Sequence, residues 1–305
     1  MLHLILAAIF LAYSIFMNTI FAAETEEKWN PVSAGPVTTW TAPLCGKGKF
    51  AAQPFFFYNR SRGIMNAEGH YDGFSGGDKK YQYQEQLFLQ YGITDHFEID
   101  AQTVYQQNYV KQGDLKAHSR GLGDSYLFLR YCPIEDSGWI PHLNAILQVK
   151  APTGKFQKAD PAKLGSDLMG ATSGGGSWDY GFGVLLSKKI KPFIIHADAV
   201  YSFPQEVKVD DVKTKYNNYL NLDTGIEYFL PKGFNLMLEF NSILQADRKK
   251  DGSRIPGTAV KSLVIAPGIG WSCQKIQTLL VYQRTLIGTN VDANDSAVLT
   301  CVYTF

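Results

Sequence analysis

Residues 216–228 read Tyr-Asn-Asn-Tyr-Leu-Asn-Leu-Asp-Thr-Gly-Ile-Glu-Tyr, and polar and apolar side chains alternate along most of this stretch. In an extended chain, one face carries Tyr216, Asn218, Leu220, Leu222, Thr224, Ile226 and Tyr228, and the other carries Asn217, Tyr219, Asn221, Asp223, Gly225 and Glu227. Successive side chains of a strand point to opposite faces, so the segment has one apolar and one polar side. Helical spacing of the apolar residues does not fit. The stretch therefore predicts a β-strand with different surroundings on its two faces.

The same period of two recurs along the chain. Twelve such segments lie near residues 49–59, 80–91, 97–107, 123–132, 141–151, 178–187, 192–203, 215–229, 234–246, 259–270, 276–287 and 295–305. Most are about ten residues long, which is the length that a tilted strand needs to cross a bilayer.

The connectors between these segments alternate in length. Those after the second, sixth, eighth and tenth segments are tight, whereas the odd-numbered connectors are mostly long and polar, above all 60–79 and 152–177. Short turns at one end and long loops at the other are typical of an outer-membrane barrel. Unpaired backbone groups are too costly in lipid, so the sheet must close. We therefore predict an all-β fold: a transmembrane up-and-down antiparallel β-barrel of about twelve strands over 49–305, with both chain ends on the periplasmic side.

The residues before the barrel divide into two parts. Leu4 to Ala22 is almost wholly apolar and is followed by an acidic run, so residues 1–22 are expected to be a cleaved signal peptide. An uncleaved membrane anchor is the alternative. Residues 23–48 have no strand pattern. They are expected either to hang in the periplasm or to enter the lumen as a plug.

The expected partners follow from the two faces of the barrel and from its end. The apolar face should contact the lipid bilayer, and the terminal Phe305, preceded by alternating apolar residues, resembles the signal that the outer-membrane assembly machinery reads. The formal net charge of +1 argues against a nucleic-acid partner.

The polar face predicts a set of side chains that line the lumen. The charged candidates are Glu98, Asp100, Asp124, Arg130, Lys150, Asp179, His196, Asp198, Asp223, Glu227 and Glu239. They serve either as a salt-bridged filling that only stabilises the barrel or as the wall of a path for a small-molecule solute. Twelve strands lie between the filled barrels of ~8 strands and the open channels of 16–18 strands.

Motifs for catalysis or cofactor binding are not found. The run 151–155, Ala-Pro-Thr-Gly-Lys, lacks the glycine and the hydroxyl residue of a phosphate loop. No serine stands in a nucleophile-elbow context, and no metal-ligand spacing is present. His196 and Asp198 share a face, but a solvated pair on the lumen wall is the simpler interpretation. We therefore expect no enzyme and no cofactor, with a barrel hydrolase as the weakest of the rival functions.

Some residues do not fit the pattern simply. Glu85 falls on the apolar face, so we expect it near the outer rim or turned inward by a bulge, and Arg284 leaves the faces of its segment ambiguous. Pro54 and Pro267 lack a ladder donor and are expected at bulges or strand ends. Four cysteines are widely spaced: Cys45, Cys132, Cys273 and Cys301. If any bridge forms, we expect it between Cys45 and Cys273, while Cys301 faces lipid unpaired.

Several strand boundaries resemble those of a known family. Gly121-Leu122-Gly123-Asp124 leads into Leu129-Arg130-Tyr131, Lys150-Ala151-Pro152-Thr153-Gly154 precedes a long loop, residues 174–180 close that loop as Gly-Gly-Gly-Ser-Trp-Asp-Tyr, and a later strand ends Tyr201-Ser202-Phe203. Together these resemble the bacterial outer-membrane family named for the meta-pathway of phenol degradation, from residue 49 to the C-terminus. The resemblance implies a barrel that passes small, often aromatic or hydrophobic compounds. It carries over no site residues.

We therefore expect an outer-membrane channel or transporter-like barrel for the passive uptake of small, aromatic or hydrophobic solutes. A structural or surface-exposed barrel with a closed lumen is the first alternative, and the barrel hydrolase is the second.

Overall fold

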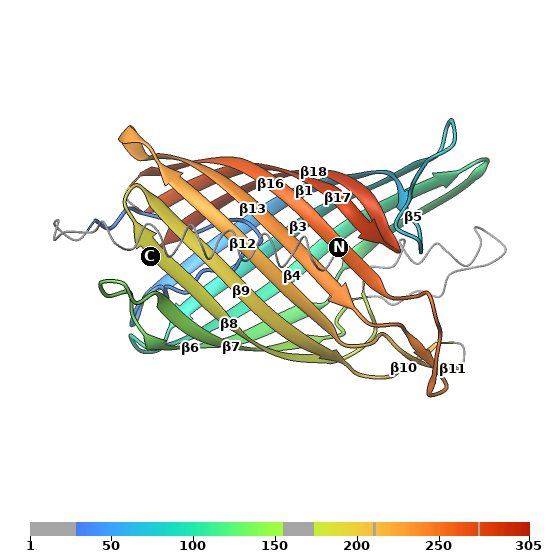
Figure 1. Ribbon diagram of the computed structural model, residues 1–305, viewed down its shortest axis with the longest axis horizontal. Coiled ribbons are helices and arrows are strands. Elements are labelled where there is room, and N and C mark those ends of the chain that lie inside the picture. The colour runs from blue at the N-terminus through green and yellow to red at the C-terminus, as the bar shows by residue number, and fades with distance from the viewer. Residues whose placement is uncertain (1–28, 155–173, 210–211, 274) are drawn as a thin grey trace.

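The computed structural model describes residues 29–154, 174–209, 212–273 and 275–305, so the expected signal peptide lies outside the described part of the chain. Its main sheet is a closed barrel of 12 antiparallel strands (Figure 1). The strands are β1 Phe50–Met65, β3 Lys79–Gly92, β4 Phe97–Gln112, β6 Ser125–Ile134, β7 His142–Ala151, β8 Asp179–Ile190, β9 Phe193–Pro204, β12 Tyr219–Phe229, β13 Phe234–Gln245, β16 Val260–Cys273, β17 Ile276–Thr289 and β18 Val291–Thr304. Each pairs with the next, and β18 pairs back to β1. The predicted fold class is confirmed.

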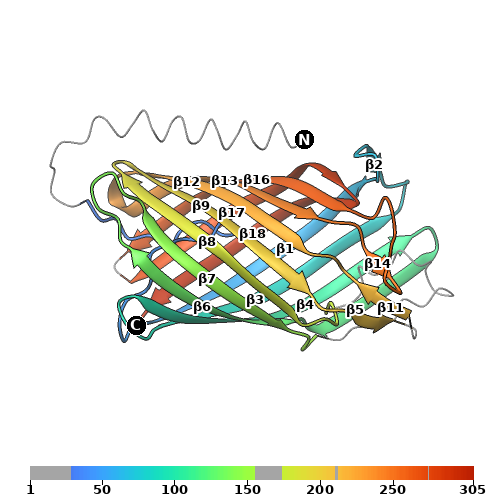
Figure 2. The same ribbon diagram turned by 60° about the horizontal axis from the view of Figure 1, so that its bottom comes forward.

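In the described part of the chain, six further short strands lie at the long-loop end, where Figures 1 and 2 label β2, β5, β10, β11 and β14. β5 (Leu115–Leu122) extends the hairpin of β4, β2 (Tyr71–Gly73) pairs with the outer end of β1, and a separate small sheet contains β10 (Val207–Val209), β11 (Val212–Lys215), β14 (Lys249–Lys250) and β15 (Ser253–Arg254). The sequence pattern did not predict them. Beyond the bilayer neither face of a strand has to be apolar, so the alternation that marks the other strands is lost.

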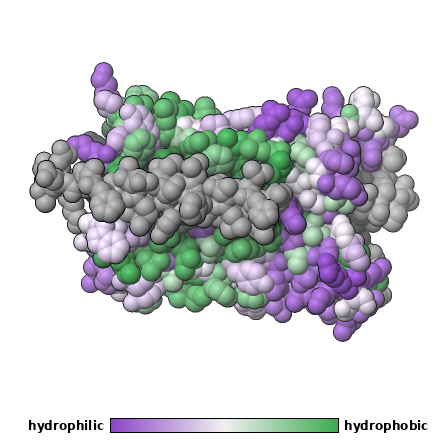
Figure 3. All heavy atoms as spheres, viewed as in Figure 1, coloured by the Kyte–Doolittle hydropathy of each residue, from purple (hydrophilic) through white to green (hydrophobic). Residues whose placement is uncertain are grey.

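On the face shown in Figure 3, a band of apolar side chains lies between two polar ends, and exposed apolar residues on strands all around the barrel continue it. It contains exposed Leu127, Leu147, Phe182, Leu236 and Leu280, each from a different strand. An exposed apolar surface that encircles the molecule is unfavourable in water and favourable against lipid. No helix in the described part of the chain is both long and apolar enough to cross a membrane.

The two prolines lie inside strands, so the prediction of bulges or strand ends is wrong. β1 keeps its register with β3 through Pro54, but its pairs with β18 skip from Ala52↔Tyr303 to Phe55↔Thr300. Likewise, Pro267 pairs with β13, while the ladder between β16 and β17 is interrupted beside it. Each proline therefore lacks its donor on one side only, and the register survives.

The two ambiguous charges both face outward. β3 pairs with β1 and β4 without a register shift, and Glu85 is exposed among Tyr83 and Leu87, so a bulge that turns it inward is excluded. Arg284 is also exposed, between outward-facing Tyr282 and Leu286 on β17.

All four cysteines are free thiols. The pairing considered for Cys45 and Cys273 is therefore not formed. Cys301 lies on the outward face of β18 and is half-buried, without a disulfide partner.

Candidate functional site

The charged residues predicted for the lumen lie at inward positions of the wall. Glu98, Asp100, Arg130, Lys150, Asp179, His196, Asp198, Asp223, Glu227 and Glu239 are buried, and Asp124, just before β6, is partly buried. Their neighbours in sequence include exposed apolar residues such as Phe97, Leu129 and Ile226. The polar and apolar faces of the strands are therefore separated as a lipid-embedded wall requires.

Residues 29–48, which we call the lumen segment, lie inside the barrel at its short-turn half. They form hydrogen bonds with side chains of β4, β6, β7, β8, β9, β12, β13 and β17. Strands on all sides of a closed barrel can contact one segment only if it occupies the interior. The lumen segment starts beside the short turn after β12, where the rings of Trp29 and Phe229 are 5.4 Å apart, and returns to that end, where Gly48 N–H donates to Gly92 O at 2.8 Å.

The innermost turn of the lumen segment is held by one carboxylate. Glu239, fully buried near the middle of β13, accepts the backbone N–H groups of Val37, Thr38 and Thr39 at 2.9, 2.9 and 2.8 Å. Successive backbone amides that converge on one anion form a strong, charge-assisted contact. Beside it, Pro36 approaches Gly225 so closely that a Cβ there would lie 2.7 Å from the proline ring. The glycine on the inward face of β12 thus makes room for the turn.

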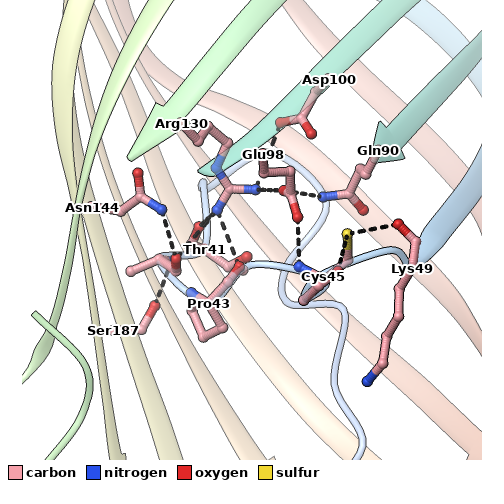
Figure 4. Close-up of polar contacts among 12 residues, drawn as sticks. Thr41, Pro43, Cys45, Lys49, Gln90, Glu98, Asp100, Arg130, Asn144 and Ser187 are labelled. Carbon is pink, nitrogen blue, oxygen red and sulfur yellow. Dashed lines mark hydrogen bonds and ion pairs between the residues drawn. The ribbon is translucent and has the colours of Figure 1, made fainter. Parts of the chain in front are cut away.

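The returning arm of the lumen segment is held by an arginine (Figure 4). The Arg130 guanidinium donates to the carbonyl oxygens of Thr41 and Pro43 and forms an ion pair with Glu98 at 2.7 Å. Glu98 also accepts the N–H of Cys45 at 2.5 Å. A buried guanidinium needs several acceptors, and here the wall supplies the charge and the lumen segment supplies the neutral oxygens. Asp100 lies 3.7 Å from the same guanidinium.

Aromatic rings fill the space beside the turn. Trp40 packs edge-on against Phe128 at 4.8 Å and Phe88 at 5.7 Å between ring centroids, and the Arg130 guanidinium lies 5.8 Å from the Trp40 ring. Together with Tyr126, stacked on Phe128, they give the lumen an apolar side opposite the acidic residues of β9, β12 and β13. Edge-on pairs of this kind are favourable beyond the area they bury.

Ser187, His196 and Glu227 form a hydrogen-bonded row across β8, β9 and β12. The serine Oγ is 2.8 Å from Nδ1 of the imidazole, and Nε2 is 3.0 Å from the glutamate. A hydroxyl, a base and an orienting carboxylate are the parts of a nucleophilic triad. However, Ser187 is buried and its Oγ also accepts the N–H of Ala42, so the lumen segment covers the hydroxyl. In this arrangement the row fixes the lumen segment. The pairing of His196 with Asp198 considered from the sequence is not formed, because Asp198 instead accepts the N–H of Trp40.

A second ionic cluster lies nearer the long-loop end. Lys150 is 2.7 Å from Asp179 and 3.5 Å from Asp124, whose two oxygens also accept the N–H groups of Gly154 and Gly175. This cluster ties together the two described ends of the longest loop at the mouth of the lumen.

Amide side chains line the wall of β1, β3 and β4 in the outer half of the lumen. They are Asn59, Gln82, Gln84, Gln86, Gln102, Gln106 and Asn108, most of them half-buried. Several bond one another, as in the pair Asn59–Gln82 at 2.9 Å and the pair Gln82–Asn108 at 2.7 Å. This wall is polar without carrying charge.

Most of the strands just described lie in a region that a family model recognises, whereas the lumen segment, β1 and β3 precede that region. The model described as "Putative MetA-pathway of phenol degradation" matches residues 96–298, well over half of the chain. The chain belongs to this family. The resemblance inferred from the strand boundaries is therefore confirmed, and this phenol-degradation-family barrel is located in the bacterial outer membrane.

Solved structures share its architecture. The crystal structure of an outer-membrane channel from Pseudomonas putida F1 aligns with a TM-score of 0.71 at 16% identity, covering 90% of this chain and 100% of that one. The NanC porin aligns with a TM-score of 0.49 at 10% identity, covering 83% and 98%. The TodX monoaromatic hydrocarbon channel aligns at 0.43 and 8%, covering 85% and 90%. The first of these shows the barrel fold, and the two weaker likenesses add nothing to that.

Sequence reasoning missed the aromatic part of the family barrel's lumen and the serine in the row with His196. Phe88 and Phe128 occupy inward positions, and Phe88 stands between Gln86 and Gln90 on the face assigned as polar. A ring that interrupts a run of polar residues was the signal from which the aromatic part of the lumen could have been predicted. The sequence around Ser187 carries no such signal, because the other two residues of its row lie on two other strands.

Proposed function

We propose that this phenol-degradation-family barrel is a passive outer-membrane channel for small solutes, and that the lumen segment forms its constriction. The observation that carries the proposal is the unequal filling of the two halves. The short-turn half holds the lumen segment on buried side chains from eight strands, whereas the outer half presents half-buried amides. A polar vestibule, lined by these amides and by the ionic cluster of Lys150, Asp124 and Asp179, that leads to a ring-lined constriction suits solutes that enter by diffusion.

The solute class follows from the chemistry of the two surfaces. Rings at Trp40, Phe88 and Phe128 favour flat apolar groups, and amides favour hydroxyl groups. Aromatic compounds with a hydroxyl group combine both, which agrees with the phenol in the family's description.

Single-channel recording on refolded protein in planar bilayers tests the proposal. The full-length protein should show steady, small openings, and a variant that lacks residues 29–43 should show larger ones because the constriction is gone. Phenol on one side should interrupt the current more strongly than cyclohexanol, which matches it in size and hydroxyl group but has no aromatic ring. Silence of the full-length protein together with openings of the shortened variant would contradict the channel and favour a sealed structural barrel.

The sealed barrel is the second candidate because the polar groups of the lumen segment are so fully hydrogen-bonded.

The hydrolase has only the row of Ser187, His196 and Glu227 in its favour. A fluorophosphonate probe should not label the full-length protein, since Ala42 covers the serine hydroxyl. Labelling that is lost in Ser187→Ala would revive that function.

A further inference from the structure

Three arginines converge on the outside of the barrel near its long-loop end. Arg60 and Arg62 lie on β1 and Arg284 lies on β17, on either side of Asp295 in β18. We call these residues the arginine patch. They face away from the lumen, so nothing in the proposed channel function uses them.

The contacts within the arginine patch leave much of its charge unpaired. The Nε of Arg62 lies 3.0 Å from Asp295, and that of Arg284 lies 3.8 Å from the same carboxylate, which also accepts the hydroxyl of Tyr282 at 2.8 Å. Arg60 pairs with Asp295 through the strand backbone, and its exposed guanidinium has no hydrogen bond or ion pair with any described residue. The Asp295 carboxylate thus contacts two of the three guanidinium groups, and within the arginine patch an excess of two positive charges remains.

The arginine patch lies at the edge of the apolar band. On β1, Arg60 follows the exposed rings of Phe56 and Tyr58, and on β17, Arg284 stands between exposed Tyr282 and Leu286. Tyr58 in turn packs against Tyr83, 5.2 Å between centroids. Aromatic side chains at this position mark the membrane interface, where head groups begin. An arginine facing the hydrocarbon would be costly, but the cost falls toward zero at the interface.

Two other carboxylates at the outer end of β1 have partners outside the arginine patch: Asp292 forms an ion pair with Lys80 at 2.6 Å, and Asp72 accepts a hydrogen bond from Asn66 at 2.9 Å. Arg62 also donates to Thr285 O at 3.1 Å and lies over the Tyr71 ring, so it is fixed in place. The outward Glu85 is four residues along β3 from Tyr81, the residue that pairs with Arg60. At about 3.3 Å per residue, that separation is ~13 Å, beyond the Debye length at physiological salt.

We infer that the arginine patch binds the phosphate groups of a phosphorylated glycolipid in the outer leaflet. Phosphate oxygens match the planar guanidinium fork bidentately, and basic pockets at the membrane interface hold anionic lipids in this way. The acyl chains of the same lipid would lie along the apolar band below, over Phe56 and Leu280. The bound lipid supplies the counter-charge that the protein itself lacks.

Lipid binding to the detergent-solubilised full-length protein tests this inference. Affinity for diphosphoryl lipid A is measured by native mass spectrometry for the wild type and for Arg60→Gln/Arg284→Gln. Arg62 is left intact because it holds the strand contacts. The matched control is Lys249→Gln/Lys250→Gln, which removes the same charge from exposed residues of β14, in the outer loops. Losing the charge-assisted bonds of two guanidinium groups should weaken lipid A binding at least ~10-fold in the arginine variant and little in the control.

Two further ligands separate the sources of phosphate. Inorganic phosphate should not compete at millimolar concentration, and phosphatidylglycerol should bind more weakly than lipid A because it carries one phosphate. Heat-modifiable electrophoretic mobility checks that each variant is folded. Equal lipid A affinity in the folded arginine variant and the wild type would overturn the inference. Equal affinity for phosphatidylglycerol, or displacement by inorganic phosphate, would overturn the assignment to a glycolipid.

Discussion

Replacement of Glu239 by Gln should release the lumen segment from the wall. The carboxylate accepts three consecutive backbone N–H groups, two on one oxygen and one on the other. A Gln side chain keeps one acceptor oxygen and turns a donor toward the remaining N–H, so at least one bond is lost. A hydrogen bond to a charged group contributes ~1.5–3 kcal/mol, and those that remain weaken with the charge removed. A total of ~3 kcal/mol would raise the population of the released state by ~100-fold.

Cys45 provides the readout, because it lies in the arm of the lumen segment that returns to β1. Burial, reinforced by the hydrogen bond and negative charge of Glu98, raises the pKa of the Cys45 thiol from 9.0 to about 12. Only the thiolate reacts with alkylating reagents, so at pH 8 the seated thiol should react ~10³-fold more slowly than a thiol of ordinary pKa. Release of the lumen segment removes both causes of the shift.

The assay measures maleimide labelling of Cys45 at pH 8 in a protein whose other three cysteines are Ser. Glu239→Gln should label up to ~100-fold faster than its parent, since labelling follows the released population. Glu85→Gln is the matched control, because the same chemical change on the outer wall touches no part of the lumen segment. If Glu239→Gln labels at the rate of the parent and of Glu85→Gln, then the Glu239 carboxylate does not hold the lumen segment in place.

Four other changes have definite expected outcomes. Lys150→Ala leaves two carboxylates uncompensated at the mouth of the lumen and should make the current more cation-selective; an unchanged reversal potential in a salt gradient would place this cluster outside the path. Arg130→Ala leaves buried carboxylates without their cation. This should reduce the free energy of unfolding by ~3–5 kcal/mol and lower the urea midpoint of unfolding. The hydrogen bond from Arg254 holds the pKa of Asp247 below its usual 3.8. The charged Asp247 carboxylate therefore stabilises the outer loop fully above pH 3.8, and this stabilisation is lost only as the pH falls through the lowered pKa. Asp247→Asn should therefore speed tryptic cleavage at Arg254 at pH 8, and equal rates would contradict this support. Phe305→Ala should reduce membrane assembly in cells without changing the stability of refolded barrel, if the terminal ring is a recognition signal; normal insertion would refute that.

The barrel was predictable from the sequence because lipid imposes a strict requirement on every strand that crosses it. Alternation in 216–228 and the alternating loop lengths each follow from that requirement, and the observed strands start and end near the predicted bounds. The outer hairpins, such as β5, lie beyond the bilayer and carry no such pattern. The side chains that the barrel wall contributes to the candidate site could be predicted from the strand faces alone. The residues that they contact could not be predicted, because the lumen segment has no periodic pattern and whether it enters the barrel depends on contacts with eight strands.

The acidic excess of the predicted lumen set contained a clue to those contacts. Apart from Arg130, Lys150 and His196, every charged candidate is a carboxylate, and buried carboxylates that lack cations must obtain donors elsewhere. In the structure, backbone N–H groups of the lumen segment serve Glu239 and Asp198, and Cys45 N–H serves Glu98. An irregular segment has the matching deficiency, since its amides are not satisfied by a ladder or helix. The wall has too few hydrogen-bond donors, and the segment before it has too few acceptors. Each can satisfy the other only if the segment enters the barrel. The same comparison would have favoured the plug over the periplasmic tail from the sequence alone.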